Sequence, residues 1–395
     1  MTTDPVLVLN CGSSSIKFAL FDTADGVARE PFWKGQVDNV MSGAARLRET
    51  GVDAVDLVLE RERPFLDALR HIRARVLARL GGRPLQAVAH RVVHGGAKYR
   101  APVRVDHAVL ADLRSYIPLA PLHQPFALEA IEALLDVNPA LPQVACFDTA
   151  FHQHMPMVER MLPLPHAAWE RGLRRYGFHG LSYEYMAVAL PERHGDAARG
   201  RAIVAHLGSG ASLCAMQGLE SVATTMGFSA LDGLMMGTRS GSLDPGVLLY
   251  LLEVDGVSPK ALGQMLYHEA GLLGVSGRSA DPRELFAHEA DDPQVQAALA
   301  LYVRRVVREI GALTAVLGGL DMLVFTAGIG EHSDAMRARI AAGLGFLDIR
   351  LDAAANAAHA PTISAPGSRV LVAVEPTNEE WIAARHALEV VPPSP

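Results

Sequence analysis

Residues 6–22, VLVLNCGSSSIKFALFD, place groups that bind oxyanions at the break between two apolar runs. The first run ends at Asn10, a glycine and three serines follow, and the second run resumes after Lys17. Hydroxyl groups, turn N–H groups and a lysine are suitable donors to phosphate oxygens. The common nucleotide loop ends in Gly-Lys-Ser/Thr and opens a helix, and neither feature is present here. We therefore expect a phosphate loop at the tip of a β-hairpin.

Similar polar clusters follow apolar stretches along the rest of the chain. The ends of such strands are where α/β proteins place ligand-binding groups. Each cluster alone is a weak signal of function, whereas the whole set in this order is a strong one. The clusters are NCGSSSIK (10–17), HRVVHGG (90–96), LAPLHQP (119–125), FDTAFHQHMP (147–156), RRYGFHGLS (174–182), HLGSGAS (206–212), MGTRSGSLDPG (236–246), TAGIGEHS (326–333) and PTNEE (376–380).

Hydrophobic patterning predicts the elements that position these clusters. Short β-rich runs predict strands, and apolar residues at helical spacing predict helices. Thr377 and Glu380 fit the capping box that starts a helix, and AGIGEHS is expected to be a glycine-rich turn. The expected strands are 6–10, 16–22, 85–90, 143–147 and 322–326, and the expected helices are 65–80, 126–135, 296–317, one from about 334 and one over 377–388.

Residues 202–216, AIVAHLGSGASLCAM, repeat the logic of the opening stretch. An apolar run again leads through a Gly/Ser turn into a second apolar run, almost half the chain after the first hairpin. This recurrence predicts two related halves, each beginning with a hairpin whose tip faces phosphate. A chance recurrence of a common turn pattern is the alternative. Strand pairs alternating with helices indicate an α/β protein with two sheets and a ligand cleft.

The composition is that of an ordinary globular protein. Of 395 residues, half are hydrophobic and a fifth are charged, and this length favours two domains. The formal net charge of −7 argues against a nucleic-acid partner, because binders of polyanions usually carry a basic balance.

Targeting and redox signals are those of a cytoplasmic protein. Cys11, Cys146 and Cys214 are odd in number and far apart, so we expect small buried thiols and no disulfide framework. The first ten residues lack the basic start and apolar stretch of a secretory leader. Residues 312–330 are the most membrane-like segment, but Asp321 and a double glycine predict a helix end, a turn and a buried strand. We expect no membrane span.

Three motifs in particular make the chain resemble the acetate kinase family of short-chain carboxylate kinases. They are Asn-x-Gly-Ser-Ser-Ser-x-Lys (10–17), Phe-Asp-Thr-Ala-Phe-His (147–152) and Met-Gly-Thr-Arg-Ser-Gly (236–241). The resemblance covers essentially the whole chain. It implies an α/β fold of two ribonuclease-H-like domains, shared with sugar kinases, actin and heat-shock ATPases, with ATP in the cleft. The implied boundaries are 1–150 plus 377–395 for the N-terminal domain and 151–376 for the nucleotide-binding domain.

The reaction implied by the resemblance is ATP + acetate ⇌ ADP + acetyl phosphate. It requires Mg²⁺, with Mn²⁺ as a substitute, and the family implies a homodimer. Phosphoryl transfer of this kind depends mainly on alignment and on neutralising an anionic transition state. A guanidinium presents a planar fork to carboxylate or phosphate oxygens. By resemblance, Arg91 orients the acyl substrate and Arg239 stabilises the transition state; a surface ion pair is the ordinary alternative for each.

The catalytic group implied by the family includes two histidines and one aspartate. His179 matches the histidine that donates to the phosphoryl group, and His123 matches a second one nearby. We expect His90, His94, His152 and His154 to be structural. Asp148 matches a residue described as a proton-transfer group. Because acetate is already ionised near pH 7, we expect Asp148 to orient Arg91 or a metal-bound water instead, with a helix N-cap as the alternative.

The resemblance also implies metal and nucleotide residues. Asn10 and Glu379 match the Mg²⁺-associated positions, and a sparse oxygen pair suffices because magnesium keeps several waters. Ser13, Ser15 and Lys17 are assigned to phosphate. The remaining nucleotide and phosphate positions are His206, Leu207, Gly208, Ser209, Gly210, Asp281, Pro282, Arg283, Gly328, Ile329, Gly330, Glu331 and His332.

The chain departs from the family pattern in several motifs. Ser209 replaces an asparagine of the second phosphate turn, Ala97 replaces the glutamate of HGGE, and Ala327 and His332 alter the GGIGEN motif. The expected acyl pocket consists of Val93, Leu122, Phe178 and Ala230, where Ala230 stands for a proline. The smaller side chain favours room for one more carbon, although a methylene is worth only about 1–3 kcal/mol.

Three alternatives to an acetate kinase remain at this point. The nearest is a propionate or broader carboxylate kinase with the same chemistry. A catalytically inactive nucleotide-binding relative is disfavoured, because Arg91, Asp148, His179, Arg239 and Glu379 are all present. A dinucleotide-dependent enzyme is poorly supported, because AGIGEHSDAM lacks the third glycine and the βαβ context of that fingerprint.

Overall fold

The computed structural model describes residues 4–12, 14–121 and 123–392. The chain forms two compact units. Unit 1 comprises Met1–Ala150 and Asn378–Pro395, and unit 2 comprises Phe151–Thr377. The sequence-based boundary before the last helix lay one residue earlier.

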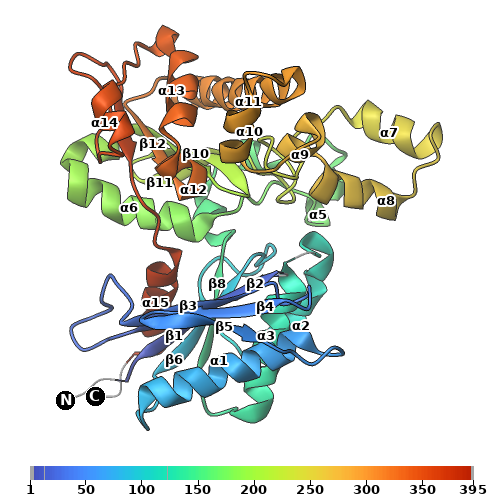
Figure 1. Ribbon diagram of the computed structural model, residues 1–395, viewed down its shortest axis with the longest axis vertical. Coiled ribbons are helices and arrows are strands. Elements are labelled where there is room, and N and C mark those ends of the chain that lie inside the picture. The colour runs from blue at the N-terminus through green and yellow to red at the C-terminus, as the bar shows by residue number, and fades with distance from the viewer. Residues whose placement is uncertain (1–3, 13, 122, 393–395) are drawn as a thin grey trace. The chain divides into compact units, whose positions relative to one another are not determined.

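Unit 1 contains one large sheet and four α-helices among its described residues (Figure 1). Its strands are β1 (Val6–Cys11), β2 (Ser15–Phe21), β3 (Trp33–Asp38), β4 (Ala45–Glu49), β5 (Val52–Leu57), β6 (Ala87–Val92), β7 (Val103–Arg104) and β8 (Gln143–Phe147). Its helices are α1 (Pro64–Leu80), α2 (His107–Ser115), α3 (Gln124–Val137) and α15 (Glu379–Val390).

The sheet of unit 1 has the order β5-β4-β3-β2-β1-β6-β8-β7. The first five strands form an antiparallel meander, and β1, β6 and β8 run parallel. Parallel neighbours end at the same edge, so the residues after β1, β6 and β8 gather there. This edge receives Asn10, Arg91 and Asp148.

Helices cover the two faces of this sheet. Leu7 and Leu9 alternate with Val6 and Val8 along β1, and all four are buried, so both faces need a cover. Leu7 and Leu9 join a core cluster with α1 and α3. α15 packs against β1, β6 and β8, and Figure 1 shows it on the other side of the sheet. The return of the last helix to the first domain is thereby explained.

Unit 2 contains a smaller sheet surrounded by more helices. Its strands are β9 (Arg201–Leu207), β10 (Ala211–Gln217), β11 (Glu220–Thr224), β12 (Met322–Thr326) and β13 (Leu371–Val374). Its α-helices are α4 (Met157–Arg160), α5 (His166–Glu170), α6 (Gly180–His194), α7 (Pro245–Glu253), α8 (Pro259–Gln264), α9 (Gly271–Ser276), α10 (Pro282–His288), α11 (Pro293–Leu317), α12 (Ala327–His332), α13 (Asp334–Ala342) and α14 (Ala353–Ala357).

The two sheets share one topology. The order in unit 2 is β11-β10-β9-β12-β13, with β9–β10–β11 antiparallel and β9, β12 and β13 parallel. The strands β3-β2-β1-β6-β8 of unit 1 have the same order and directions. The recurrence of the hairpin pattern is therefore a structural repeat, and each turn predicted to bind phosphate joins the first two strands of its sheet.

Local details differ from the sequence-based expectations in two places. AGIGEHS is not simply a turn, because Ala327–His332 form the short helix α12. Thr377 is not the N-cap of the last helix: Asn378 has that position, and its Oδ1 accepts a hydrogen bond from the Trp381 backbone N–H at 3.1 Å. The Thr377 hydroxyl donates instead to Ser182 Oγ at 2.9 Å, so a tertiary contact replaced the local capping box.

The three cysteines are buried, as the sequence predicts. Cys11, Cys146 and Cys214 are buried, and burial raises the pKa of the Cys11 and Cys214 thiols to about 12. Within the described residues, no helix combines the length and hydrophobicity needed to cross a membrane.

Candidate active site

The tip of the β1–β2 hairpin brings two predicted residues side by side. Asn10 and Lys17 are register partners across the antiparallel pair, and the Lys17 side chain is exposed. The Gly12 backbone N–H donates to the Ser15 carbonyl at 2.9 Å, which closes the turn. Ser13 lies outside the described residues. An amide oxygen and an ammonium group therefore share the end of this hairpin.

Arg91 is the centre of a charged cluster in unit 1. Its Nε donates to Asp148 Oδ1 at 2.9 Å and its Nη2 donates to Asp148 Oδ2 at 2.7 Å, which is a two-pronged pair. Its Nη1 lies 3.2 Å from Glu379 Oε2. Asp148 is 2 % exposed, so its carboxylate is a rigid support for the guanidinium. Residues from β6, from the end of β8 and from the start of α15 thus meet at one point.

Burial and neighbouring opposite charges shift the pKa values of this cluster in opposite directions. Burial by itself disfavours the charge of Arg91, but Asp148 and Glu379 outweigh it and raise the pKa of the guanidinium. Burial raises the pKa of Glu379, while the positive charges of Arg91 and Lys17 oppose that rise. The influence of Lys17 on Glu379 connects the hairpin tip with the start of α15.

The donor set of unit 1 fits a hard divalent cation held sparsely. Asn10 offers an amide oxygen and Glu379 a carboxylate, both of which are oxygen ligands that Mg²⁺ accepts. Within the described residues, no group of three His, Cys, Asp or Glu side chains could hold a metal ion. Such a site would take one or two protein oxygens and leave the other positions to water and phosphate.

The other described residues predicted in unit 1 differ in their surroundings. Val93 is half-buried just after β6, and His123 is half-buried at the start of α3. Leu122 lies outside the described residues. His90 and His94, expected to be structural, are buried, and burial lowers the pKa of each to about 4.

The second turn predicted to bind phosphate, within residues 206–212, lies beside two other predicted residues of unit 2. The Gly208 backbone N–H donates to the Gly210 carbonyl at 3.1 Å, and Ser209 is exposed at the tip. A Cβ placed on Gly210 would lie 3.2 Å from His179 Nε2 and 3.6 Å from Arg239 Nη1. Glycine therefore lets the turn approach both side chains closely. Leu207 is fully buried.

His179 is held in an unusual backbone conformation. His179 is the N-cap residue of α6, and its φ of 58° lies in the left-handed region that residues other than glycine rarely adopt. Its ring stacks on that of His206, with 4.1 Å between the ring centroids and 16° between the planes. The two imidazoles are thus packed face to face behind the turn.

The loop before α7 carries Arg239 into the same region of unit 2. Arg239 Nη1 donates to the Ala230 carbonyl at 3.1 Å, and burial lowers the pKa of its guanidinium. The loop depends on Gly271, whose φ is 63° and whose hypothetical Cβ would collide with the carbonyl of Met236. Phe178 is 2 % exposed, and its carbonyl accepts a hydrogen bond from His152 Nε2 at 3.0 Å. The hydrogen bond from Arg239 to the Ala230 carbonyl makes these two predicted residues direct neighbours.

His152 and His154 differ in their surroundings. His152 is buried between Phe178 and Ser221, whose Oγ lies 2.8 Å from Nδ1, and burial lowers its pKa to about 4. His154 is exposed. Neither reaches the region of the Gly210 turn through a described hydrogen bond.

The predicted nucleotide loop forms α12. Glu331 Oε1 accepts hydrogen bonds from the backbone N–H groups of Ala327 at 2.8 Å and Thr377 at 3.2 Å. Ala327 has a φ of 64°, so alanine occupies a position that favours glycine. Gly328, Ile329 and Gly330 form the turn of this helix, and the His332 side chain is exposed. The Glu331 carboxylate therefore braces the loop itself.

Asp281, Pro282 and Arg283 start α10. The Asp281 side chain caps the helix by accepting from the Arg283 backbone N–H at 2.9 Å. Its carboxylate also pairs with the exposed Arg283 guanidinium at 2.6 Å, and the hydrogen bonds from Arg283 lower the pKa of Asp281.

Sequence reasoning missed several buried polar residues behind these motifs. Arg337 is fully buried, and its Nη1 donates to the carbonyls of Gly330 and Glu331, both at 2.8 Å. Ser212 Oγ lies 2.9 Å from His179 Nδ1 and 2.5 Å from Tyr183 Oη. Ser212 ends the motif HLGSGAS (206–212) but had no assigned role, and Tyr183, in the first turn of α6, directly follows the motif RRYGFHGLS (174–182).

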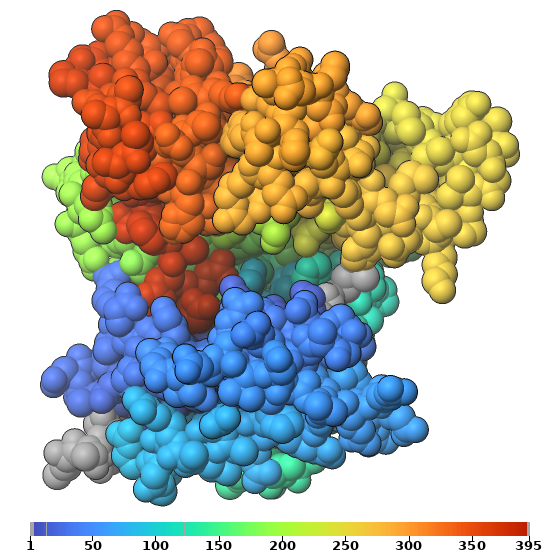
Figure 2. All heavy atoms as spheres, viewed as in Figure 1, coloured from blue at the N-terminus to red at the C-terminus, as the bar shows by residue number. Residues whose placement is uncertain are grey.

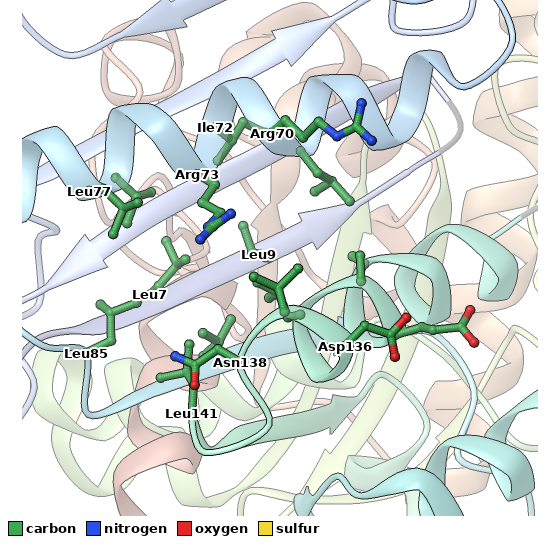
Figure 3. Close-up of a pocket in the computed structure, with 18 of the residues that line it drawn as sticks. Leu7, Leu9, Arg70, Ile72, Arg73, Leu77, Leu85, Asp136, Asn138 and Leu141 are labelled. Atoms are coloured by element: carbon green, nitrogen blue, oxygen red, sulfur yellow. The ribbon is translucent and has the colours of Figure 1, made fainter.

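A separate cavity lies in unit 1 between α1, α3 and the sheet (Figure 3). Its volume is about 760 Å³, and leucines such as Leu7, Leu9 and Leu85 form much of its lining. It includes none of the described residues predicted for the site. The chemistry is therefore expected at the sheet edges and not in this apolar cavity.

The chain is similar to proteins of one family over almost its whole length. The model of the acetokinase family matches residues 5–385. An acetate kinase from Rhodopseudomonas palustris is 48 % identical over 390 residues, covering 97 % of this chain and 98 % of that protein. The crystal structure of an acetate kinase from Porphyromonas gingivalis is 34 % identical, with a TM-score of 0.86 and coverage of 98 % and 99 %.

A propionate kinase from Francisella tularensis is also similar. Its crystal structure is 33 % identical, with a TM-score of 0.88 and coverage of 97 % of this chain and 98 % of that one. These matches confirm the predicted α/β fold class and the resemblance inferred from the motifs. The chain has a charged cluster around Arg91 and a glycine turn beside His179 and Arg239. Together with the matches over almost its whole length, these features show that the chain belongs to the acetokinase family.

Proposed function

We propose that this protein is an acetate kinase that transfers the γ-phosphoryl group of ATP to acetate. A carboxylate oxygen of acetate forms a bond to the γ-phosphorus while the bond from that phosphorus to the β,γ-bridging oxygen breaks, which gives acetyl phosphate and ADP. The observation that carries the proposal is the Arg91 guanidinium, fixed in direction by Asp148 within a cluster that includes Glu379. The family membership and the similar acetate kinases support it.

Each residue has a role that its surroundings permit. Arg91 orients the substrate carboxylate, because its guanidinium is fixed in direction by Asp148 at Nε and Nη2 and by Glu379 beside Nη1. Asp148 acts through Arg91, since a carboxylate substrate needs no general base near pH 7. Arg239 and His179 donate to the phosphoryl oxygens as negative charge develops on them. His123 is assigned a secondary donor role.

Nucleotide-binding roles are assigned separately to residues of each unit. Ser13, Ser15 and Lys17 serve the phosphates from the first hairpin, and residues 206–210 serve them from the second. Residues 281–283 and 328–332 are assigned to the adenosine. Asn10 and Glu379 would hold Mg²⁺ or Mn²⁺, which lowers the negative charge of the phosphates when bound. The three buried thiols and the substrates suit a cytoplasmic location.

Measurement of acetyl phosphate tests this function directly. Purified protein with Mg-ATP and acetate is expected to form acyl phosphate that hydroxylamine traps as hydroxamate, and omission of the divalent cation should abolish the signal. Absence of product with acetate, propionate and butyrate would favour the inactive relative. A kcat/KM for propionate more than tenfold above that for acetate would make the protein a propionate kinase.

The carboxylate preference is expected to depend on Ala230. Ala230→Pro should shift the ratio of kcat/KM for acetate over propionate by about fivefold or more toward acetate, because the ring removes space worth about one methylene. The Ala230 carbonyl that binds Arg239 is retained, and no described hydrogen bond uses its N–H. Side-by-side kinetics with both acids measure the ratio, and an unchanged ratio would remove Ala230 from the acyl pocket.

We also propose that the protein is a homodimer that uses α7. None of the nine residues of α7, all described, is buried, although six of them are apolar. Exposed fractions are 47 % for Val247, 55 % for Leu249 and 56 % for Tyr250, and 65 % for Val254 directly after the helix. Figure 2 shows this helix and α8, in yellow, projecting from the body of unit 2. Such a surface is typical of an interface, and a second copy is the occupant that the family implies.

Leu249→Glu combined with Tyr250→Glu is expected to convert the dimer to a monomer of 42.3 kDa in sedimentation analysis. A carboxylate in an apolar interface would lose its hydration without a partner. Val58→Glu, at a side chain 96 % exposed in unit 1, is the matched control and should leave the mass unchanged. A monomeric wild-type protein, or a dimer in the double variant, would contradict the assignment.

A further inference from the structure

Behind the second phosphate turn, two hydroxyl groups and an imidazole form a continuous hydrogen-bonded chain. Tyr183 Oη lies 2.5 Å from Ser212 Oγ, and Ser212 Oγ lies 2.9 Å from His179 Nδ1. Tyr183 and Ser212 are both fully buried. These bonds are therefore not exposed to competition from bulk water, and such a chain has a defined direction of donation.

Three separate elements fix the members of this chain. Tyr183 is in the first turn of α6 and belongs to the core cluster between that helix and the sheet. Ser212 is on β10, where it is the register partner of His206 on β9. The His206 ring in turn stacks on the His179 ring. The imidazole of His179 is thus held by its face and by Nδ1.

The opposite edge of His179 faces the turn. The Cβ position of Gly210 lies 3.2 Å from His179 Nε2, so Nε2 and its neighbour Cε1 are next to the backbone assigned to phosphate. A neutral imidazole carries one N–H, and the bond made by one nitrogen decides whether the other is a donor. If Nδ1 accepts from Ser212, Nε2 carries the proton and donates toward the turn.

We propose that Tyr183 and Ser212 are positioning residues that fix the ring and the tautomer of His179 by donating in the order Tyr183 to Ser212 to His179 Nδ1. His179 then presents Nε2–H to a phosphoryl oxygen as a neutral donor. The reverse order would present a lone pair to an anionic oxygen, which is repulsive. This role rests on the proposed phosphoryl transfer. The left-handed backbone of His179 then serves to place its ring between Ser212 and the turn.

His206 has the same arrangement on the other side of the stack. Its Nδ1 lies 2.9 Å from Ser182 Oγ, and Ser182 accepts from the Thr377 hydroxyl at 2.9 Å. Because the Thr377 hydroxyl donates a hydrogen bond to Ser182 Oγ, the Ser182 hydroxyl is free to donate its own hydrogen to His206 Nδ1. Both stacked imidazoles are therefore anchored through a serine that a second hydroxyl orients, which supports the same direction for the Tyr183 chain.

Two variants test the positioning role by kinetics. Ser212→Ala and Tyr183→Phe are each expected to lower kcat by about 10-fold to 100-fold while KM for ATP and acetate changes less than twofold, because misplacement of a donor acts on the transition state. In a His179→Gln background, Ser212→Ala is expected to have no further effect. An equal loss in both backgrounds would mean that Ser212 acts on the fold, and the proposal would be overturned.

Tyr302→Phe is the matched control. Tyr302 is a fully buried tyrosine of α11 in the same unit, and its hydroxyl has no hydrogen-bond partner among the described residues. Its variant should keep the wild-type kcat. A loss in Tyr302→Phe equal to that in Tyr183→Phe would show a general effect of removing a buried hydroxyl and would contradict the relay.

The tautomer is measured without reference to activity. Protein labelled with ¹⁵N-histidine, with His179→Gln used for assignment, should show His179 with a protonated Nε2 and an unprotonated Nδ1 at pH 7.5. Ser212→Ala should change this pattern toward a mixture of tautomers. A protonated Nδ1 in wild type, or an unchanged pattern in Ser212→Ala, would overturn the proposal. An inactive wild type with the expected pattern would instead overturn only the proposed function.

Discussion

Arg239→Ala is expected to lower kcat for acetyl phosphate formation by about 10³-fold, with little change in KM for ATP. A guanidinium that contacts the phosphoryl oxygens mainly in the transition state contributes to kcat and much less to ground-state binding. Burial lowers the pKa of Arg239, which indicates a poorly hydrated charge whose electrostatic effect is less screened by water. Arg239→Lys keeps a charge without the planar fork and should lie between wild type and Arg239→Ala.

Steady-state kinetics with varied ATP and acetate measure these effects. Arg199→Ala is the matched control, because Arg199 is an exposed arginine of the same unit, and its variant should retain wild-type kinetics. Thermal unfolding of each variant shows whether loop 236–239 has lost its structure. A folded Arg239→Ala protein that keeps more than a tenth of kcat would remove Arg239 from the transition state.

The folded protein is expected to lose stability steeply between pH 6.5 and pH 4, because three buried histidines resist protonation. Burial lowers the pKa of His90, His94 and His152 from 6.5 to about 4. Above pH 6.5 the three are neutral in both states, so this contribution is fully present. Below pH 6.5 the unfolded chain binds these protons and the folded chain does not, which costs about 2 kcal/mol per histidine at pH 5.

Urea unfolding at pH 7.5, 6.0 and 5.0 measures how the free energy of unfolding changes with pH. Replacement of His90 by Gln should reduce the slope by about one proton, equivalent to about 1.4 kcal/mol per pH unit, even if it lowers stability at pH 7.5. His107→Gln is the control, because that side chain is exposed. Glu379 acts in the opposite direction, since its raised pKa makes the folded state gain relative stability as the pH falls. A pH-independent midpoint would contradict the linkage.

The sequence predicted strongly patterned elements well. β8 (Gln143–Phe147) and β12 (Met322–Thr326) each contain four consecutive apolar residues, and α11 (Pro293–Leu317) has apolar residues at helical spacing. The strands β3 (Trp33–Asp38), β4 (Ala45–Glu49) and β5 (Val52–Leu57) were not predicted. They lie toward the edge of the sheet, where charged residues alternate with buried ones or replace them, so their hydrophobic signal is weak.

The sequence also led to the charged and glycine-rich groups of the candidate site, because their residue types and order carry the chemistry. It could not predict which side chains each group contacts. Arg91, Asp148 and Glu379 are far apart in the chain, and the pairing distances depend on β6, β8 and α15 meeting at one sheet edge. Likewise, only the fold shows that Arg239 donates to Ala230, which ties the expected specificity position to the expected transition-state stabiliser.

The sequence by itself thus determined the family, the paired hairpins and the candidate reacting groups, because each is written in a local pattern or in the order of motifs. Only the tertiary structure decided that Thr377 binds Ser182 and not its own helix, that Ala327 takes a glycine-like conformation, and that Ser212 and Tyr183 stand behind His179. A serine or tyrosine hydroxyl has several partners of similar energy nearby in the chain. The choice among them is made by the fold, which buries the hydroxyl away from water and leaves only a few partners within hydrogen-bond distance.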